Sequence, residues 1–223
     1  MFSNEKFVRL DGFLADDLSV VNSARVSFGR KSETLTDADI GLIRFLMREQ
    51  HGTPFEHNFF RFHVRAPIFV VREWFRHRSG WSYNEFSGRY AEMPAGAWVP
   101  DLDEVRTQIG KPGAYTFEAL DSDNAKEAQS VIAEASSSAW RTYKYLLSKG
   151  VAKEIARTIL PVGTYSEFYA SCNARSLMHF CSLRNHPSAQ AEIRWYAQQL
   201  ELHLEQLMPE TYKVFLEFGR KAP

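Results

Sequence analysis

The sequence predicts a helix-rich α+β fold in a single domain, residues 1–223, with a small and mostly antiparallel sheet. Most periodic segments repeat apolar residues every three or four positions, as helices do, while one alternates apolar and charged residues, as a half-buried strand does. The chain has 223 residues, 44% of them hydrophobic, which is enough for one substantial core.

The first elements are a strand and a helix. Asn4–Phe13 predicts a short strand with weak alternation. Thr36–His51 predicts a helix with Thr36 as its N-cap, Asp39 completing a variant capping box, and Gly52 ending it.

A second strand is expected where apolar and charged residues alternate from Phe60 to Arg65. Pro67 suits the first turn of a following helix, because proline lacks the N–H that would be unpaired there. Ile68, Val71 and Phe75 are expected to form the buried face of that helix.

The rest of the chain predicts a loop and four helices. Ala91–Gly113 holds three prolines and three glycines and is expected to be a loop or a variable insertion. A long helix is expected to begin at a cap on Asp123 or Asn124 and to end at Ser148. Its expected inward residues are Ala128, Val131, Ile132, Ala135, Ala139, Tyr143, Leu146 and Leu147. The later helices are expected at Ala152–Leu160, Ala174–Arg184 and Ser188–Met208.

The charge balance excludes some partners. With 27 basic and 27 acidic residues, the chain has no overall attraction for nucleic acid or an anionic membrane, so any anion site must be local. No segment approaches the roughly 20 apolar residues of a membrane span, and the first residues do not resemble a signal peptide, so a cytoplasmic location is expected. Cys172 and Cys181 lack CxxC spacing and are expected to pack as small apolar residues.

Arginine dominates one stretch of the chain. Between Ser32 and Gly110 there are nine arginines and no lysine. The planar guanidinium suits bidentate contacts with phosphate or carboxylate and keeps its charge when partly buried. Four of these arginines face away from apolar stripes, so surface ion pairs are predicted for them rather than a ligand site: Arg44, Arg48, Arg61 and Arg65.

Residues 72–90 differ from the rest of this stretch. Arg72 and Arg76 lie one turn apart on the expected helix, with Arg78 near its end, and such stacked charges require an anion or carboxylate to neutralise them. The expected loop that follows offers hydroxyls, an amide, glycines, aromatic rings and another guanidinium: Gly80, Ser82, Tyr83, Asn84, Phe86, Ser87, Gly88, Arg89 and Tyr90. This combination predicts a nucleotide or other anion site, with structural ion pairs as the alternative.

Other site types have weaker support. No GxGxxG pattern is present, which argues against a Rossmann dinucleotide site. His51, His57 and His63 recur every six residues, which fits metal ligation only on a long strand, and Pro54 would interrupt it. No metal is expected, and His51 and His57 are interpreted as contacts to a cofactor or to local backbone. A non-enzymatic RNA- or nucleotide-binding protein is the remaining alternative, which the neutral charge disfavours.

Arg76-His77-Arg78, followed after eight residues by Ser87, resembles the signature of the flavin-dependent thymidylate synthases. Further blocks similar to that family occur in its order within residues 24–184. They are Ala24–Ser27, Thr53–His57, Ala66–Phe69, Tyr83–Glu85, Ser87–Tyr90, Ala156–Arg157, Leu160–Pro161, Asn173–Met178 and Leu183–Arg184.

The resemblance implies an enzyme that makes thymidylate from deoxyuridine monophosphate. It would take a methylene group from methylenetetrahydrofolate and reducing equivalents from NADPH through FAD, and release tetrahydrofolate. It also implies a homotetramer whose active sites combine residues of several subunits. The expected partners are therefore these small molecules and other copies of the chain, without nucleic acid or membrane.

The resemblance also assigns roles to individual residues. Arg184 would contact the uracil edge and act catalytically by stabilising negative charge on the ring. The expected nucleotide-binding residues are Glu73, Arg76, Glu85, Ser87, Gly88, Arg89, Arg157 and Arg184. The expected flavin-binding residues are Ser27, Thr53, Arg76, His77, Arg78, Glu85, Asn173, Arg175 and His179.

Some positions depart from the family pattern. The eight-residue gap before Ser87 is the longer of the family's spacings, and His179 and Glu73 stand where asparagine and glutamine are common. No base that would activate Ser87 is evident, so Ser87 is interpreted as a phosphate or ring ligand rather than a nucleophile.

Overall fold

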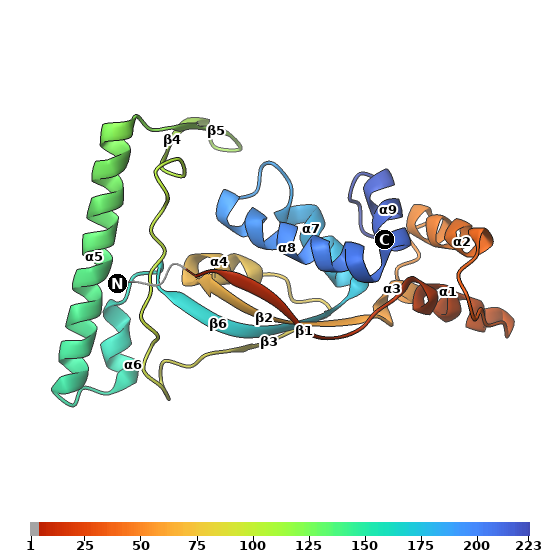
Figure 1. The fold of residues 1–223 in the computed structure, drawn as a ribbon, viewed down its shortest axis with the longest axis horizontal. Coiled ribbons are helices and arrows are strands. Elements are labelled where there is room, and N and C mark those ends of the chain that lie inside the picture. The colour runs from red at the N-terminus through yellow and green to blue at the C-terminus, as the bar shows by residue number, and fades with distance from the viewer. Residues whose placement is uncertain (1–4) are drawn as a thin grey trace. The chain divides into compact units, whose positions relative to one another are not determined.

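The computed structural model describes residues 5–223 and shows an α+β fold, as predicted (Figure 1). The elements before β3 are β1 (Phe7–Leu14), α1 (Asp17–Arg25), η1 (Val26–Phe28), α2 (Asp37–Arg48), α3 (Thr53–Glu56), β2 (Phe59–Pro67) and α4 (Ile68–Trp74). The middle of the chain forms β3 (Trp81–Glu85), β4 (Arg106–Lys111), β5 (Ala114–Ala119), α5 (Ser122–Ser148), α6 (Lys153–Ala156) and η2 (Arg157–Ile159). The last elements are β6 (Tyr165–Asn173), α7 (Ala174–Arg184), α8 (Ala191–Leu207) and α9 (Pro209–Glu217).

The described residues divide into two compact units. The first contains residue 5 with residues 66–69 and 86–166, and the second contains residues 6–65, 70–85 and 167–223. That residues 1–223 behave as one domain stays a prediction.

The second unit is organised around a four-stranded sheet with strand order β1-β2-β6-β3. The pairs β1–β2 and β3–β6 are antiparallel, as predicted for most of the sheet. On β2, Phe60, Phe62 and Val64 are buried while Arg61 is exposed, which confirms the predicted alternation. Helices α7 and α8 lie over one face of this sheet (Figure 1).

Trp74 is the centre of the core in this unit. Its ring lies 5.3 Å from that of Phe168 on β6, 4.8 Å from Phe180 on α7 and 6.0 Å from Tyr196 on α8. All four side chains are at most 1% exposed. The rings therefore fix α7 and α8 against the sheet, and α7 carries much of the site described below.

Helix α2 confirms its predicted cap. The backbone N–H of Thr36 donates to Asp39 at 2.9 Å, and that of Asp39 donates to the Thr36 hydroxyl at 3.4 Å. The hydrogen bond from the Thr36 hydroxyl holds the pKa of Asp39 below its usual value, helped by the bonds from the Thr36 N–H and the Ser32 hydroxyl and by the charge of Arg25. The helix ends at Arg48, three residues before the predicted His51.

Helix α4 departs from its prediction in two ways. Pro67 is the last residue of β2, and the helix begins at Ile68, so the proline precedes the first turn instead of lying in it. The buried face is formed by Val70, Val71 and Trp74, whereas Ile68 is only half-buried.

The first unit contains α5, whose N-cap is Asp121 rather than Asp123 or Asn124. The Asp121 carboxylate accepts the N–H of Asn124 at 3.1 Å. Tyr143 is fully buried at the centre of a small core with Met93 and Ala156. The predicted inward face is only partly inward in the described chain, because Val131 is 62% exposed.

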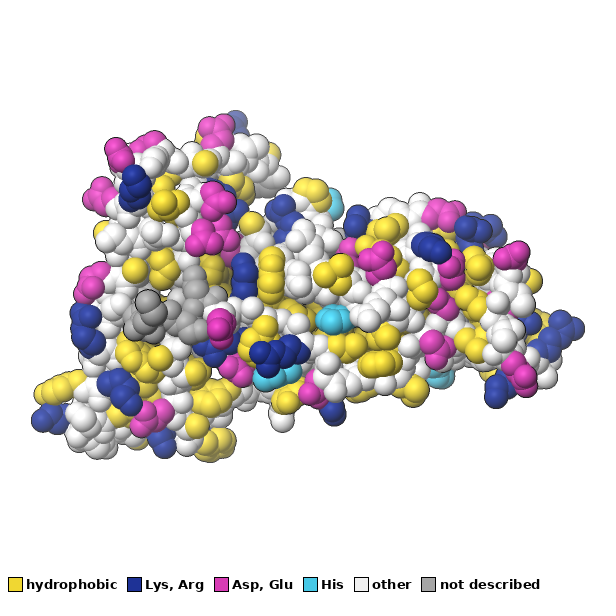
Figure 2. All heavy atoms as spheres, in the orientation of Figure 1, with side chains coloured by type: hydrophobic (Ala, Val, Ile, Leu, Met, Phe, Trp, Pro, Cys, Tyr) yellow, Lys and Arg dark blue, Asp and Glu magenta, His cyan; other side chains and the backbone are white. Residues whose placement is uncertain are grey.

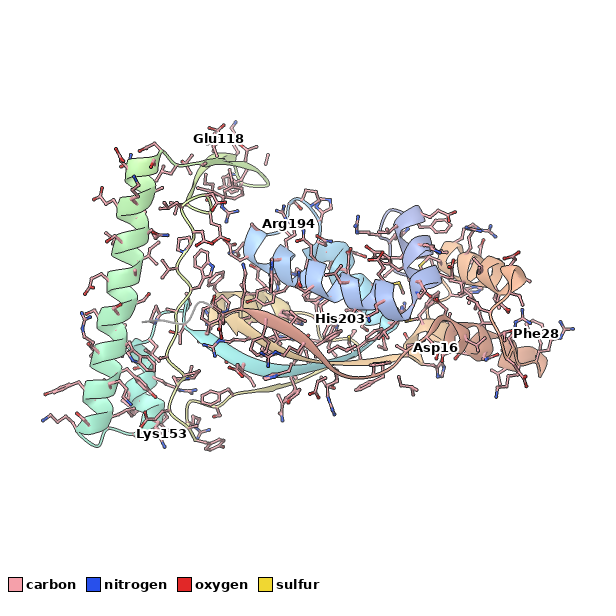
Figure 3. The ribbon with its side chains drawn as sticks, in the orientation of Figure 1. Asp16, Phe28, Glu118, Lys153, Arg194 and His203 are labelled. Carbon is pink, nitrogen blue, oxygen red and sulfur yellow. The ribbon has the colours of Figure 1, made fainter. Side chains whose placement is uncertain are left out.

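The sequence predictions missed several elements. Strands β4 and β5 form a hairpin that begins inside the predicted loop Ala91–Gly113, and Figure 3 labels Glu118 on it. Strand β3 lies where a loop was expected, and α1, α9 and β6 were not predicted. The predicted helix Ala152–Leu160 is one α-turn followed by a 3-10 turn.

Charged side chains, the two cysteines and the helix lengths complete the description of residues 5–223. Basic and acidic side chains are interspersed over the visible face (Figure 2). Cys172 and Cys181 are buried and free, and burial raises the pKa of both thiols. Among the described helices none has the length and apolar character to cross a membrane. Within residues 5–223 no three His, Cys, Asp or Glu side chains are grouped to hold a metal ion.

Candidate functional site

Three pockets in the second unit have residues of helix α7 in their walls. Their volumes are about 770, 480 and 470 Å³. Arg175 lines the first and third pockets, and His179, one helical turn later, lines the second and third. The three pockets are therefore neighbours around the first turns of α7.

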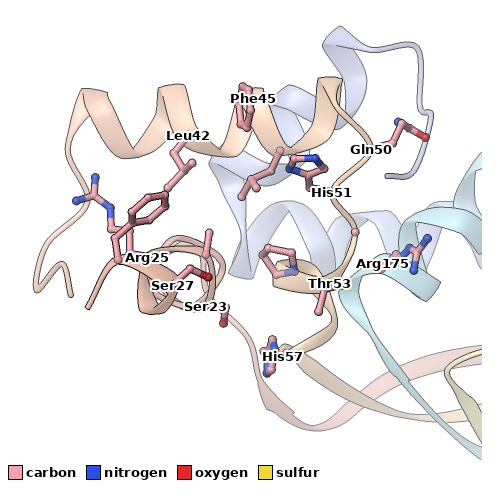
Figure 4. Close-up of a pocket in the computed structure, with 15 residues that line it drawn as sticks. Ser23, Arg25, Ser27, Leu42, Phe45, Gln50, His51, Thr53, His57 and Arg175 are labelled. Atoms are coloured by element: carbon pink, nitrogen blue, oxygen red, sulfur yellow. The ribbon is translucent and has the colours of Figure 1, made fainter. Parts of the chain in front are cut away.

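The largest pocket has apolar and hydroxyl-bearing walls. Figure 4 shows Leu42 and Phe45 bordering it from α2, with Ser27 and Thr53 on other sides. The prediction that Ser27, Thr53 and Arg175 share a site is consistent with this geometry. Phe28, 80% exposed, lines the outer part of the pocket and is labelled on η1 in Figure 3.

His51 and His57, which the sequence suggested as contacts to a cofactor or to local backbone, also line the largest of these pockets. The ring of His51 packs edge-on against Phe45 at 5.6 Å. His63 lies elsewhere, with its Nε2 3.2 Å from Glu167 and its ring stacked on Tyr169. The six-residue spacing of the three histidines thus does not bring them to one site.

Arg175 is held at the boundary between the first and third pockets. Its Nη1 donates to Glu56 at 2.6 Å, and its Nε donates to the carbonyl of Pro223 at 2.6 Å. A Cβ at Gly52 would come within 2.4 Å of the Arg175 Nε. Glycine is therefore required at position 52 for the guanidinium to lie there.

The beginning of α7 depends on its N-cap and on a close approach of the backbone at Gly80. Asn173 is the N-cap, and its side chain accepts the N–H of Ser176 at 2.8 Å. Gly80 has φ +68°, and a Cβ there would lie 2.2 Å from the Ser176 hydroxyl, which donates to Ser79. The Arg76–Ser79 segment is thereby fixed against the first turn of α7.

The second pocket collects most of the predicted cationic residues. Its described lining residues are Arg76, His77, Arg78, Ser79, Trp81, His179, Leu183, Arg184, Ser188 and Ala189. Helix α4 ends at Trp74, so Arg76 and Arg78 follow the helix instead of lying on it as predicted, and both are exposed. Arg72, one turn earlier, is not among the lining residues.

Arg184 is fixed by two partners at the wall of this pocket. Its Nη1 donates to the Glu73 carboxylate at 3.0 Å and its Nη2 to the Glu73 carbonyl at 3.2 Å. Its Nε donates to Nε2 of His77 at 3.0 Å. Burial, with the positive charge of Arg184 beside it, lowers the pKa of His77 to about 4. Burial also raises the pKa of Glu73, against the opposing effect of Arg184.

A further cluster lies in the first unit, around the turn that begins at Ser87. The Ser87 carbonyl accepts the N–H groups of Tyr90 and Ala91. Gly88 is buried, and a Cβ there would lie 2.6 Å from the sulfur of Met93 and 3.1 Å from Cδ of Arg157. Gly88 and Arg157, far apart in sequence, are therefore neighbours.

Arg89 in the same turn makes an exposed ion pair. Its Nε lies 3.1 Å from the carboxylate of Glu154, and both side chains are more than half exposed. Such exposed pairs contribute about 0.2–1 kcal/mol, so a stronger anion is able to displace the carboxylate.

Comparison with known proteins identifies the family. A family model described as thymidylate synthase complementing protein (Thy1) matches residues 10–210. The flavin-dependent thymidylate synthase of Tropheryma whipplei (strain TW08/27) is 45% identical over 234 residues, covering 100% of this chain and 97% of the relative. That of Streptomyces coelicolor is 45% identical over 221 residues, covering 94% of this chain and 90% of the relative.

The chain belongs to the flavin-dependent thymidylate synthase family. The resemblance and the expectation of an enzyme are thereby confirmed. A crystal structure of the UMP/dUMP methylase PolB from Streptomyces cacaoi, bound with 5-Br UMP, has a TM-score of 0.92 and 44% identity. It covers 100% of this chain and 98% of that protein. The same methylase bound with 5-Br dUMP has a TM-score of 0.91 at 44% identity.

The structure groups the predicted residues of this family member only in part. Arg76, His77 and Arg184 share the second pocket, whereas Glu85 ends β3 and is not among the lining residues of the three pockets. Leu42 and Phe45 were not predicted as site residues. They lie three positions apart on α2, next to the buried residues of that helix. This second pair of apolar residues at helical spacing was the feature of the sequence that could have indicated them.

The four arginines predicted to form ion pairs do so. Arg44 pairs with Glu217, Arg48 with Glu49, Arg61 with Asp11 and Arg65 with Glu167. The prediction was wrong in one respect, because Arg65 is buried instead of lying on a solvated face. Arg65 lies near the buried end of β2, two residues before Pro67. There its Nη1 pairs with the carboxylate of Glu167 at 2.7 Å, which neutralises the charge.

Proposed function

We propose that this chain methylates deoxyuridine monophosphate to thymidylate, with methylenetetrahydrofolate as the carbon donor and NADPH, through FAD, as the reductant. The near full-length similarity to proteins named flavin-dependent thymidylate synthase carries the proposal. The pocket that contains Arg76, Arg78 and Arg184 supports it, because a nucleotide monophosphate requires cationic partners.

The residues of the second unit fit FAD. Arg175 and Arg76 offer guanidinium groups for a pyrophosphate, and Leu42 and Phe45 offer an apolar wall for a flat ring. Gly52 and Gly80 permit close packing that any Cβ would prevent. The remaining residues proposed to hold the cofactor are Ser27, Thr53, His77, Arg78, Glu85, Asn173 and His179.

When bound, FAD supplies the hydride that reduces the transferred one-carbon group to a methyl group, and NADPH supplies the electrons. In the overall reaction the C5–H bond of the uracil is replaced by a C5–CH₃ bond. The C5 proton is lost, tetrahydrofolate is released and NADP⁺ is formed.

Arg184 is the proposed catalytic residue. Attack through C5 requires negative charge to build up on the ring and its carbonyl oxygens. Arg184 is held in place before the substrate arrives, so its cation stabilises that charge without reorganising. The proposed nucleotide ligands are Glu73, Arg76, Glu85, Ser87, Gly88, Arg89, Arg157 and Arg184.

A homotetramer is proposed as the active assembly. Large apolar side chains of the first unit are exposed in the single chain, among them Val131, Ile155 and Val162 at 62%, 58% and 51%. Exposed apolar patches are commonly covered by other subunits. In such an assembly, nucleotide ligands from the two units are free to come from different subunits. Light scattering of the purified protein measures the oligomer directly, and a monomer at micromolar concentration would contradict this assembly.

Uridine monophosphate is a second candidate substrate. The solved structure with a TM-score of 0.92 is that of a UMP/dUMP methylase. Parallel assays with the two nucleotides at equal concentration decide between them, and we expect deoxyuridine monophosphate to give the higher kcat/KM.

The test of the function is an anaerobic assay with added FAD, NADPH, methylenetetrahydrofolate and deoxyuridine monophosphate. We expect NADPH oxidation that depends on the nucleotide and the folate, with thymidylate as the product by liquid chromatography. Purified protein that binds no flavin and yields no methylated nucleotide would favour the alternative of a nucleotide-binding protein without catalysis.

A further inference from the structure

Residues 219–223, called the strap below, follow α9 and contact helix α7. Helix α9 ends in a Schellman motif: the N–H of Gly219 donates to the Leu216 carbonyl at 3.0 Å, and that of Arg220 donates to the Phe215 carbonyl at 2.8 Å. Gly219 has φ +65°, the left-handed conformation that this motif requires. Pro223 is buried, and its carbonyl accepts from Arg175 on α7.

Arg220 has a second left-handed conformation within the strap. Its φ of +58° costs free energy for any residue with a Cβ, and the Schellman motif requires such a conformation only at Gly219. Arg220 is held there by Glu201, which is 4% exposed and accepts from its Nε at 3.1 Å and its Nη2 at 3.3 Å. The Ser182 hydroxyl donates to the Arg220 carbonyl. Because Ser182 is in the last turn of α7 and Arg175 in the first, this turn directs the strap along that helix.

The strap borders the third pocket. Ala222 and Pro223 line it together with three residues proposed to hold the cofactor: Asn173, Arg175 and His179. The pocket has a volume of about 470 Å³ with the strap in place. The strap is therefore a wall of the proposed flavin site and does not fill it.

Arg175 is fixed along one edge and available along the other. A guanidinium has five N–H donors. The Nε donor goes to Pro223 and one Nη1 donor goes to Glu56, while Gly52 packs so closely that a Cβ there would lie 2.4 Å from Nε. Within residues 5–223, the second N–H of Nη1 and both of Nη2 have no protein partner, and the side chain is 45% exposed. Arg175 thus keeps three donors for a ligand.

We propose that the strap is a positioning element of the flavin site, which acts on FAD by fixing Arg175, and that Arg220 holds the strap in place. A guanidinium that is fixed before the cofactor arrives loses less side-chain entropy when it binds a pyrophosphate. The inference rests on the proposed function, which assigns Arg175 to FAD. It adds the strap and Arg220 to the residues on which cofactor binding depends.

Removal of residues 221–223 tests this role directly, because Arg175 then loses the Pro223 carbonyl. The dissociation constant of FAD is measured by diluting the holoenzyme and following the recovery of flavin fluorescence. We expect this constant to rise about 10-fold. Arg220→Ala should also raise it, whereas Arg220→Gly should recover part of the loss, because glycine adopts a positive φ without strain. Far-UV circular dichroism checks that each variant is folded.

A double-mutant cycle separates action through Arg175 from a general effect on the fold. In the Arg175→Ala background, removal of residues 221–223 should change the dissociation constant of FAD less than about 2-fold, because its effect requires Arg175. Glu217→Gln is the matched control. It breaks an ion pair with Arg44 at 3.0 Å, at the end of α9 but outside the strap, and should keep the wild-type constant.

The outcomes are distinct. A wild-type constant in the variant that lacks residues 221–223 would overturn the proposal. Tighter FAD binding would also overturn it, because the strap would then compete with the cofactor. So would equal losses in the wild-type and Arg175→Ala backgrounds. A wild-type holoenzyme that forms no thymidylate would contradict the proposed function, while the FAD constants would still decide the role of the strap.

Discussion

Gly80→Ala is expected to lower the free energy of unfolding by more than the backbone penalty of a positive φ alone. Gly80 has φ +68°, where an alanine costs about 1–2 kcal/mol. The added Cβ would also lie 2.2 Å from the Ser176 hydroxyl and 2.9 Å from the Asn173 amide. Moving these groups sacrifices the bond from Ser176 to Ser79 and weakens the N-cap of α7, at about 1 kcal/mol each. The total is about 3–4 kcal/mol.

Gly29→Ala is the matched control for this prediction. Gly29 has nearly the same φ, +60°, but nothing lies within 4 Å of a Cβ there. Its cost should therefore be only the backbone penalty of about 1–2 kcal/mol. Urea unfolding of both flavin-free variants, at one protein concentration, measures the difference. With a slope of about 2 kcal/mol per M, Gly80→Ala should lower the midpoint by about 1 M more than Gly29→Ala. Equal midpoints would refute the close-approach argument.

Three further predictions concern Arg184, His77 and Asp121. Arg184→Ala should retain flavin by absorbance but lose about 10²- to 10³-fold in kcat, and a near-normal rate would show that the assigned role is wrong. His77 has a pKa lowered from 6.5 to about 4, so the unfolded chain binds the extra proton first. Its contribution to stability should thus be full above pH 6.5 and decline as the pH falls towards 4, and His77→Gln should flatten that decline in urea titrations. Asp121→Ala should lower the urea midpoint by removing the α5 cap, whereas the exposed Asp123→Ala should leave the midpoint nearly unchanged.

Patterns among neighbouring residues of the sequence were enough to predict the elements that local interactions stabilise. The Thr36 cap and the alternation on β2 follow from neighbours in sequence, and both are present in the structure. Strand β6 was missed because its inward residues are Ser166, Phe168, Ala170 and Cys172, of which only one is a large apolar side chain. Its alternation becomes visible only once β3 and β2 lie beside it.

The position of the long-helix cap illustrates another limit. Asp121, Asp123 and Asn124 are all good N-caps, so residue type alone does not select among them. The structure selects Asp121, whose carboxylate accepts the N–H of Asn124. The hairpin of β4 and β5 was not predicted because glycines and prolines interrupt Ala91–Gly113, where it begins, and because the residues of both strands are exposed and show no apolar alternation.

The candidate site was predicted by residue identity, but its hydrogen bonds were not. The family resemblance named Arg76, His77 and Arg184, which line one pocket. It gave no indication that His77 accepts from Arg184, because residues 107 positions apart pair only through the packing of α7 on the sheet. The arginine-rich composition likewise did not distinguish the buried Arg65 from its exposed neighbours.

The fate of the transferred carbon tests the central claim most directly. The purified protein is incubated without oxygen with FAD, NADPH, deoxyuridine monophosphate and folate labelled with ¹³C in its methylene group, and the nucleotides are analysed by mass spectrometry. We predict thymidylate that carries the label in its methyl group, and its loss in Arg184→Ala. Oxidation of NADPH with the nucleotide left unlabelled would contradict the account.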